Sequence, residues 1–271
     1  MKVPKAGALV AVVGLALTAS GCGGDSGPKG NLEIGIKFDQ PGVGLREQGG
    51  TFSGFDVDVS TYIAKELGYK PEQIEFKKVD SSDRELLLQY NEVKFVAASY
   101  SINEKRKEKV DFAGPYFLAH QDLLVRADDT TITKAEDLNN KKLCSVTGST
   151  SAQNVKEKLA PKASVLELDG YSECVIALQD GLVDALTTDN SILAGYAAQK
   201  ANAGKFKLVG LSLSNENYGI GVKKGNKDLQ AKINAALRKM VQDGSWDAAV
   251  KKNFGPANYR NEPAPQITTG S

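Results

Sequence analysis

The amino-acid sequence predicts an α/β protein built as two lobes with a cleft between them. Apolar segments with strand character alternate with helical segments along most of the chain. The alternation restarts after Tyr116, so residues 121–220 are expected to form a second lobe, and residues 32–120 and 221–256 a discontinuous first lobe. Two strand-like crossings are expected between the lobes, at residues 117–126 and 216–225.

Periodicity supports the elements of the first lobe. Phe55, Val59, Ile63 and Leu67 recur every four residues, which predicts one buried face of a helix that ends at Gly68. The strands expected in this lobe cover residues 32–37, 74–79 and 93–99, and its further helices cover residues 82–90, 227–244 and 245–255.

The second lobe shows the same alternation of shorter segments. Its expected strands cover residues 142–146, 163–168 and 183–188, and its expected helices cover residues 133–140, 148–160, 172–181 and 190–201. An interlobe cleft is where small ligands bind in such proteins, and hinge closure is the usual motion.

The charge of the chain argues against nucleic acid as a partner. The 271 residues include 34 Lys and Arg and 33 Asp and Glu, so the net charge is close to zero. The apolar fraction of 41% and the charged fraction of 25% are those of a soluble globular protein.

Both ends of the chain are expected to lie outside the two lobes. Residues 1–21 combine a cationic start with a short apolar stretch, and they resemble a bacterial lipoprotein signal with Cys22 as the lipidated residue. The alternative is ordinary signal-peptidase cleavage. Residues 22–31 have the composition of a flexible tether, and residues 257–271 are expected to form a loose C-terminal tail. An exported, lipid-anchored protein follows from this interpretation.

The three cysteines fit an exported protein. If Cys22 carries lipid, Cys144 and Cys174 remain in an oxidising environment, where a disulfide is expected. Two buried free thiols are the alternative, because the sequence does not give the distance between them.

Three loops at the carboxyl ends of predicted strands carry candidate binding residues. The first begins with the hydroxyls of Ser99 and Ser101 and continues into a short helix with Arg106, whose planar fork matches a carboxylate. The second is the helix start TGSTS, residues 147–151, and the third ends in Asp189. Taken singly, these residues could be a solvated arginine and two helix N-caps. Together they suit a zwitterion, with arginine for a carboxylate and aspartate for an ammonium group.

These motifs resemble those of the amino-acid-binding proteins of bacterial ABC importers, which have the type II periplasmic-binding-protein fold. The resemblance rests on SYSINEKR, VDFAGPY, TGSTS, LVDALTTDN and DGSWDAAVKKNFG, in this order over nearly the whole chain after the signal. It implies an α-carboxylate site of Arg106, Ser101, Thr150 and Ser149, and an α-ammonium site of Asp189 and Ser99. Asn103 stands where the family usually has threonine, and we interpret it as a changed helix N-cap.

The side-chain pocket is expected to be basic. The first strand places Lys37 at the cleft, at a position that is basic in the glutamate and aspartate binders of this family. Ser82 and Glu85 have the spacing of a capping box, which makes Arg84 the second residue of a helix, where an anion would offset its unfavourable position in the helix dipole. The resemblance adds Ser81 to this group. The alternative is that Lys37 and Arg84 are solvated surface cations.

The whole pattern resembles the glutamate-binding lipoproteins of high-GC Gram-positive bacteria. This implies a monomeric protein without cofactor or metal, which binds L-glutamate and delivers it to ABC permease subunits. A separate ATPase is required, because the chain has no G-x-x-x-x-G-K-[ST] loop. Phe38 is a candidate apolar wall of the pocket, and for Phe55 core packing is favoured over that role. His120 and Arg46 are further candidates that the sequence does not place.

Three alternatives stay open. The ligand could be aspartate, or glutamine, which has the shape of glutamate without its charge. The protein could be a ligand sensor of the same fold. It could also be an enzyme like the cyclohexadienyl dehydratases, although the sequence shows no paired carboxylates and one histidine, His120, for acid–base chemistry.

Overall fold

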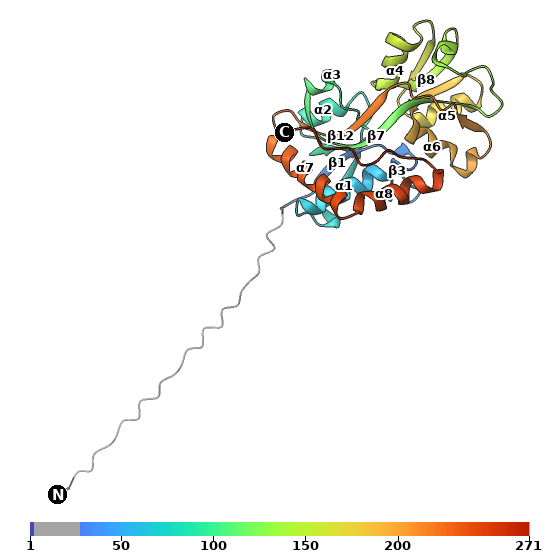
Figure 1. Cartoon of the computed structure of the whole chain (residues 1–271). Helices are drawn as coiled ribbons and strands as arrows, with labels where there is room; N and C mark the ends of the chain where they lie inside the picture. The colour runs from blue at the N-terminus through green and yellow to red at the C-terminus, as the bar shows by residue number, and fades with distance from the viewer. Residues whose placement is uncertain (3–27, 271) are drawn as a thin grey trace.

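The computed structural model describes residues 1–2 and 28–270, so Cys22 and most of the predicted signal peptide and tether lie outside the described residues. Within the described chain, nine strands form a sheet in the order β5-β1-β6-β12-β7-β10-β8-β9, with β11 also paired to β7. The predicted α/β class is confirmed (Figure 1).

The first half of the structure is built on the strands at one end of this sheet. Its strands are β1 (Leu32–Ile36), β5 (Ile74–Lys78) and β6 (Phe95–Val96). Its helices are α1 (Phe55–Glu66), α2 (Arg84–Gln89), α3 (Glu104–Lys107), α7 (Lys227–Gln242) and α8 (Ser245–Phe254). The strand expected over residues 93–99 is much shorter than predicted, because the chain turns at Ser99, whose φ of 42° breaks an extended conformation.

The second half is built on β8 (Lys142–Val146), β9 (Ser164–Leu168), β10 (Ala185–Asp189) and β11 (Phe206–Leu208). Its α-helices are α4 (Thr150–Asn154), α5 (Tyr171–Gln179) and α6 (Asn190–Ala197). A π-helix follows α4 at Val155–Leu159, and the helix expected over residues 133–140 is a single 3-10 turn at Ala135–Leu138.

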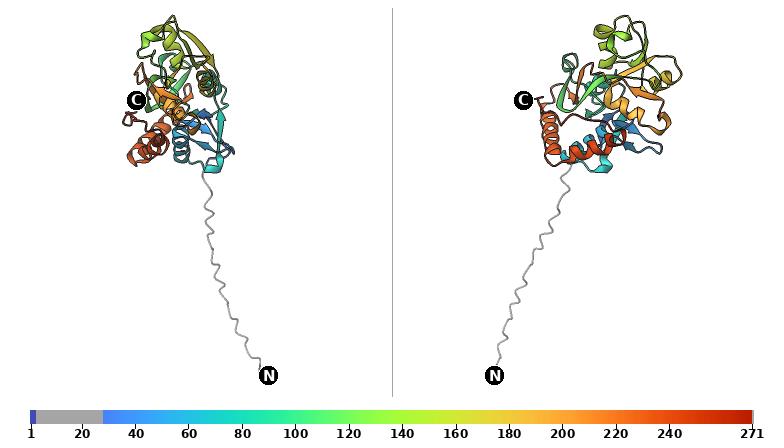
Figure 2. Two further views of the ribbon diagram at one scale, coloured as in Figure 1. Left: turned by 90° about the vertical axis from the view of Figure 1, so that its right-hand side faces the viewer. Right: turned by 45° about the vertical axis from the view of Figure 1, so that its right-hand side comes forward.

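One long strand joins the halves. In β7 (Val110–Arg126), residues as far as His120 pair with β12 (Asn215–Lys223), and the following residues pair with β10. The predicted domain boundary at residues 120/121 falls at this change of partner, and the division into lobes stays a prediction. Figure 2 shows the two halves from two further sides.

The periodicity of α1 corresponds to a real buried face. Phe55, Val59 and Ile63 are each at most 1% exposed and belong to the main apolar core, which confirms the core role favoured for Phe55. Gly54 precedes this helix with a φ of 123°, and a Cβ there would lie 2.3 Å from the carbonyl oxygen of Val43. Only glycine fits this close approach.

A small antiparallel sheet of β2 (Asp39–Gln40), β3 (Gly44–Arg46) and β4 (Phe52–Ser53) was not predicted. Its first strand reaches the second half: the Asp39 carboxylate accepts a hydrogen bond from the Ser172 amide of α5, and the Asp39 carbonyl accepts one from the Tyr196 hydroxyl of α6. A Cβ at Gly195 would lie 2.0 Å from the carbonyl oxygen of Pro41, so the two halves are in tight contact here.

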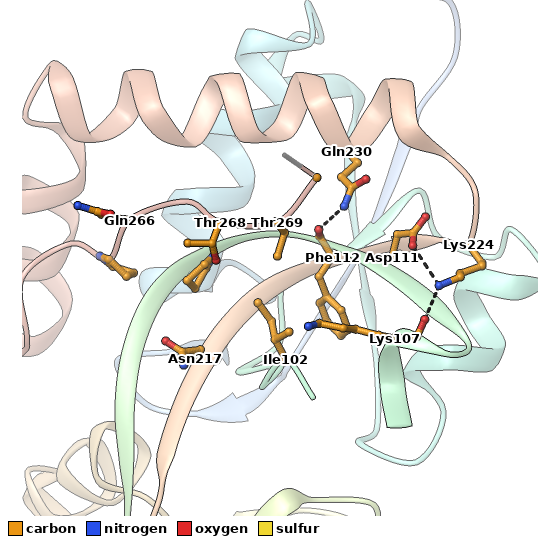
Figure 3. Close-up of a pocket in the computed structure, with 13 residues that line it drawn as sticks. Ile102, Lys107, Asp111, Phe112, Asn217, Lys224, Gln230, Gln266, Thr268 and Thr269 are labelled. Atoms are coloured by element: carbon orange, nitrogen blue, oxygen red, sulfur yellow. Dashed lines mark hydrogen bonds and ion pairs between the residues drawn. The ribbon is translucent and has the colours of Figure 1, made fainter. Parts of the chain in front are cut away.

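The prediction of a loose C-terminal tail is wrong. The amides of Thr268 and Thr269 donate to the carbonyl oxygen of Gly114 in β7, and Asn234 of α7 donates to the carbonyl of Thr269. The segment runs across the long strands (Figure 1) and covers a cavity of about 680 Å³, whose lining includes Phe112 and Asn217 (Figure 3). These hydrogen bonds, together with the partly buried side chains of Ala264 and Ile267 against the main core, hold the segment in place.

Candidate functional site

Arg106 is buried where the two halves meet. Asn103 caps α3 by accepting a hydrogen bond from the Arg106 amide, as predicted. The guanidinium donates to the carbonyl of Ser101 at 2.6 Å and, across to the second half, to the carbonyl of Gly148 at 3.0 Å. Its exposure of 7% argues against the solvated alternative.

Two arginines of the first half lie close to one aromatic ring. The guanidinium carbon of Arg84 lies 4.1 Å from the ring centre of Tyr100, and that of Arg106 lies 5.0 Å from it. Cation–π attraction stabilises both charges against burial. The pKa of Arg84 is nevertheless lowered to about 10, first by burial and then by the charge of Arg106.

Lys37 and Arg84 meet at Ser81. Lys37 Nζ donates to the Ser81 hydroxyl at 2.9 Å, and Arg84 Nε donates to the Ser81 carbonyl at 3.3 Å. Exposures of 4% and 2% exclude the alternative of solvated surface cations. In the described chain, neither residue has a carboxylate as an ion-pair or hydrogen-bond partner. Burial, followed by repulsion from Arg84, lowers the pKa of Lys37 to about 7.

The predicted capping box next to this group is wrong. Helix α2 begins at Arg84, its N-cap is Asp83, and no side chain makes the capping hydrogen bond. Ser82 instead donates to the Asp83 carboxylate. Arg84 is therefore the first residue of the helix, and its side chain folds back to the carbonyls of Ser81 and Ala98.

The candidate ammonium site contains Asp189 at the end of β10. The Tyr218 hydroxyl of β12 donates a hydrogen bond to its carboxylate. Burial and then the charge of Glu216 raise the pKa of Asp189 to about 8, while Tyr218 and Arg106 act in the opposite direction. A buried carboxylate of this kind gains most from a cationic partner.

The hydroxyls at the start of α4 are already engaged. Ser149 is the N-cap, and its hydroxyl accepts from the Ala152 amide at 3.1 Å. Thr150 directs its hydroxyl to the Glu216 carboxylate at 2.9 Å. Glu216 was not predicted, because an isolated acid in a strand pattern gives no local signal of a hydrogen bond to a helix start 66 positions away.

Ser99 is held in a left-handed conformation by residues that the sequence analysis missed. Its amide donates to the carboxylate of Asp56 at 2.8 Å, and its hydroxyl donates to the side-chain carbonyl of Gln40 at 3.1 Å. The Tyr116 hydroxyl is the second donor to Asp56, whose pKa burial raises to about 6. The one feature of the sequence that could have indicated Asp56 is the position of this acid on the apolar face of the helix that begins at Phe55.

Three of the candidate residues, Ser81, Arg106 and Ser149, line a common cavity. The other candidate binding residues are not among its lining residues: Lys37, Arg84, Ser99, Ser101, Thr150 and Asp189. A cavity of about 350 Å³ is lined from the first half by Ser81 and Arg106 and from the second half by Gly148 and Ser149. Its volume is in the range of small-molecule sites. Of the two charge signs that a zwitterion requires, this lining provides the buried cation Arg106, whereas the buried carboxylate of Asp189 lies outside the lining. Among the described residues, no cluster of three or more potential metal ligands occurs.

This cavity is also not lined by the two described cysteines, His120 or Arg46. Cys144 and Cys174 form a disulfide between β8 and α5, with their Cα atoms 5.5 Å apart. His120 lies in β7, where its ring nitrogens contact Asn215 and Glu262. Arg46 is exposed, and its guanidinium lies over the ring of Phe38 at 5.9 Å. His120 and Arg46 therefore contact other residues of the fold rather than this cavity.

Comparison with known proteins identifies related sequences and folds. The model of the bacterial extracellular solute-binding proteins, family 3, matches residues 32–256. The chain is 45% identical to the glutamate-binding protein GluB of Corynebacterium efficiens, over 92% of this chain and 90% of that protein. It is 43% identical to the ABC transporter glutamine-binding protein GlnH of Bacillus subtilis, over 82% and 80%.

A solved structure shows the same fold. An ancestral arginine-binding protein bound to arginine superposes with a TM-score of 0.78 at 41% identity, over 84% of this chain and 99% of that protein. In the described part of the present chain, no helix has both the length and the apolar character needed to cross a lipid bilayer.

Proposed function

Because the chain belongs to the bacterial extracellular solute-binding proteins of family 3 and is an amino-acid-binding receptor of ABC transport, we propose that its ligand is L-glutamate. Both GluB proteins of Corynebacterium, at 45% and 46% identity, are named for glutamate. Aspartate and glutamine remain the nearest competitors.

The observation that carries this proposal is the pair of buried cations at Ser81. A buried charge without an opposite charge is costly, and Lys37 and Arg84 have no carboxylate partner among the described residues. A ligand side-chain carboxylate between them would accept hydrogen bonds from both. A neutral amide would leave the two charges uncompensated.

The α-amino-acid group is assigned to the other candidate residues. Arg106 and Ser101 would bind the α-carboxylate together with the helix start at Ser149 and Thr150. For Thr150 we assign the backbone amide, because its hydroxyl already donates to Glu216. Asp189 and Ser99 would bind the α-ammonium group.

Glutamine is the second candidate for a specific reason. The lowered pKa of Lys37, about 7, means that a neutral amine is accessible near physiological pH. A neutral Lys37 can accept a hydrogen bond from the glutamine amide. GlnH of B. subtilis, at 43% identity, is named for glutamine.

The role in transport that we propose is the one implied by membership of this family. We propose a monomeric protein, anchored through a lipid on Cys22, that delivers its ligand to permease subunits powered by a separate ATPase. Binding without catalysis is proposed because the matched relatives are named as binding proteins. Cyclohexadienyl-dehydratase-like turnover and a sensory role are the alternatives, which an activity assay and capture of the membrane partner distinguish.

Calorimetric titration tests the ligand. The protein without residues 1–22 would be stripped of bound amino acid by partial unfolding, refolded, and titrated with L-glutamate, L-aspartate, L-glutamine and L-arginine. We expect micromolar or tighter glutamate binding, about −8 kcal/mol or better, and glutamine binding at least tenfold weaker. Equal or tighter glutamine binding would reject glutamate as the preferred ligand and leave the α-amino-acid site intact.

A further inference from the structure

The side-chain amide of Gln40 is a buried polar group with unused hydrogen-bonding capacity. The residue has 0% exposure, and its Oε1 accepts a hydrogen bond from the Ser99 hydroxyl at 3.1 Å. Its Nε2 atom has no hydrogen-bond partner in the part of the chain that the structure describes. Buried amide donors are nearly always paired in native proteins, so an unpaired one requires an explanation.

The position of Gln40 connects it to the candidate site. It follows Lys37 by three residues on the segment that leaves β1, and it is one hydrogen bond away from Ser99. Its backbone is fixed, because its carbonyl accepts from the Val43 amide at 3.0 Å. Its neighbours Asp39 and Pro41 contact the second half, so the backbone that carries Gln40 lies at the junction of the two halves.

A comparison with Gln121 shows that the unused donor is not general for buried glutamines of this chain. Gln121 also has 0% exposure, but its Nε2 donates to the Ser151 carbonyl and the Thr187 hydroxyl. Its Oε1 accepts from Asn154. Gln121 therefore has the fully bonded environment of a structural residue, whereas Gln40 keeps a donor available.

We propose that Gln40 is a specificity-determining residue whose amide donates a hydrogen bond to the oxygen at the end of the ligand side chain. The inference rests on the proposed amino-acid site and adds a selection rule to it. A carboxylate accepts about four hydrogen bonds, so Lys37 and Arg84 do not exhaust the acceptor capacity of glutamate. Glutamine also carries a side-chain oxygen, whereas arginine carries only donors. Gln40 thus selects side chains that end in an acceptor, and Lys37 selects among these by charge.

The test compares Gln40→Leu and Gln40→Glu with the wild-type protein in calorimetric titrations with glutamate, glutamine and arginine. Gln40→Leu removes the donor, and we expect glutamate and glutamine to lose affinity together, each by at least tenfold. Gln40→Glu keeps the shape and replaces the donor with an acceptor or a charge, and we expect a larger loss for glutamate than for glutamine.

Thermal unfolding in the absence of added amino acid separates ligand recognition from folding. Gln40→Leu should change Tm by less than Gln121→Leu, because Gln121 loses several hydrogen bonds and Gln40 loses one. Glutamate affinity of Gln40→Leu within twofold of wild type would overturn the inference and leave the proposed function standing. Tighter glutamate binding by Gln40→Glu would also overturn it, since the amide would then face the ligand ammonium as an acceptor. Failure of the wild-type protein to bind any of the amino acids would reject the proposed function itself.

Discussion

Arg106 of the first half donates a hydrogen bond to the carbonyl of Gly148 in the second half, at 3.0 Å. Gly148 directly precedes Ser149, the N-cap of α4, so the arginine lies against the turn that begins this helix. The same guanidinium donates to Ser101 in its own half. The residue proposed to hold the ligand α-carboxylate therefore also ties the two halves together.

Replacing Arg106 should abolish ligand binding. In Arg106→Ala the ligand carboxylate would be desolvated without a charged partner, so we expect a loss of at least 100-fold in affinity for every amino acid that the wild-type protein binds. Arg106→Lys should recover little, because an ammonium group cannot form the two-pronged contact. Calorimetry measures both. Lys107→Ala, on the same helix but outside the lining of the candidate cavity, is the matched control, and equal losses in both alanine variants would contradict the assignment.

Removing the charge of Lys37 should change ligand preference rather than binding in general. In Lys37→Met the buried ammonium is lost at similar side-chain length, so glutamate should bind at least tenfold more weakly while glutamine keeps or gains affinity. Competition between the two amino acids measures the ratio. Lys77→Met, on the neighbouring strand β5, is the control, and an unchanged ratio in Lys37→Met would remove Lys37 from the side-chain pocket.

Glutamate affinity should rise with pH, reach a plateau near neutral pH, and then fall. Asp189, with a pKa of about 8, must lose a proton to pair with the ligand ammonium, so below pH 7 affinity should rise by up to tenfold per pH unit. Lys37, with a pKa of about 7, must gain a proton to pair with the ligand carboxylate, so above pH 8 affinity should fall. Between about pH 7 and pH 8, the proton that Asp189 releases on ligand binding is balanced by the proton that Lys37 takes up, so the affinity should not change with pH.

Titrations at constant ionic strength check this profile, and Lys37→Met provides its control. The variant should keep the rise toward pH 8 and lose the fall above it. A glutamate profile that is flat from pH 5 to 9 would mean that neither group changes protonation on binding.

The disulfide should stabilise the fold substantially. Cys144 and Cys174 are separated by 30 residues, and closing a loop of this length lowers the entropy of the unfolded chain by an amount worth about 3–4 kcal/mol. Replacing both residues by alanine should lower Tm by roughly 10 °C for a protein of this size. Reductant should lower the Tm of the wild-type protein and leave that of the variant unchanged. A change in the Tm of the variant on adding reductant would show that reductant destabilises the protein by a route other than this disulfide.

Asp56 should matter more for stability than its neighbour Asp58. Asp56→Ala leaves the Ser99 amide and the Tyr116 hydroxyl without their acceptor, at a cost of about 2 kcal/mol or more in the free energy of unfolding. The Asp58 carboxylate lies nearer the surface and accepts from Lys252 and Asn253 of α8, which water can replace, so Asp58→Ala should cost about 1 kcal/mol. Denaturant unfolding compares them. Equal effects would show that Asp56 does not hold the turn at Ser99.

The regular elements could be predicted from local patterns. Strand β8 was predicted with its observed bounds, and α1 was predicted from the four-residue spacing of its buried face. The sheet of β2, β3 and β4 was missed because its strands are two or three residues long and several glycines interrupt them. The capping box at Ser82 failed because the spacing of two residue types does not fix where a helix begins.

The residues of the candidate site could likewise be predicted only in part. Arg106, Asp189 and Lys37 could be named because charged residues follow strands at recognisable motifs. Gln40 and Asp56 could not, since their importance comes from contacts with Ser99, which is more than 40 positions away in sequence in both cases. Pairings of this kind depend on the folded sheet, which brings distant turns together.

The place of β12 in the sheet determines the order in which the chain can fold. This strand lies between β6 and β7, yet it begins only at Asn215, long after β6 ends at Val96. During synthesis, the first half therefore stays without its central strand until most of the chain has emerged. Pairings so distant in sequence slow the formation of stable structure.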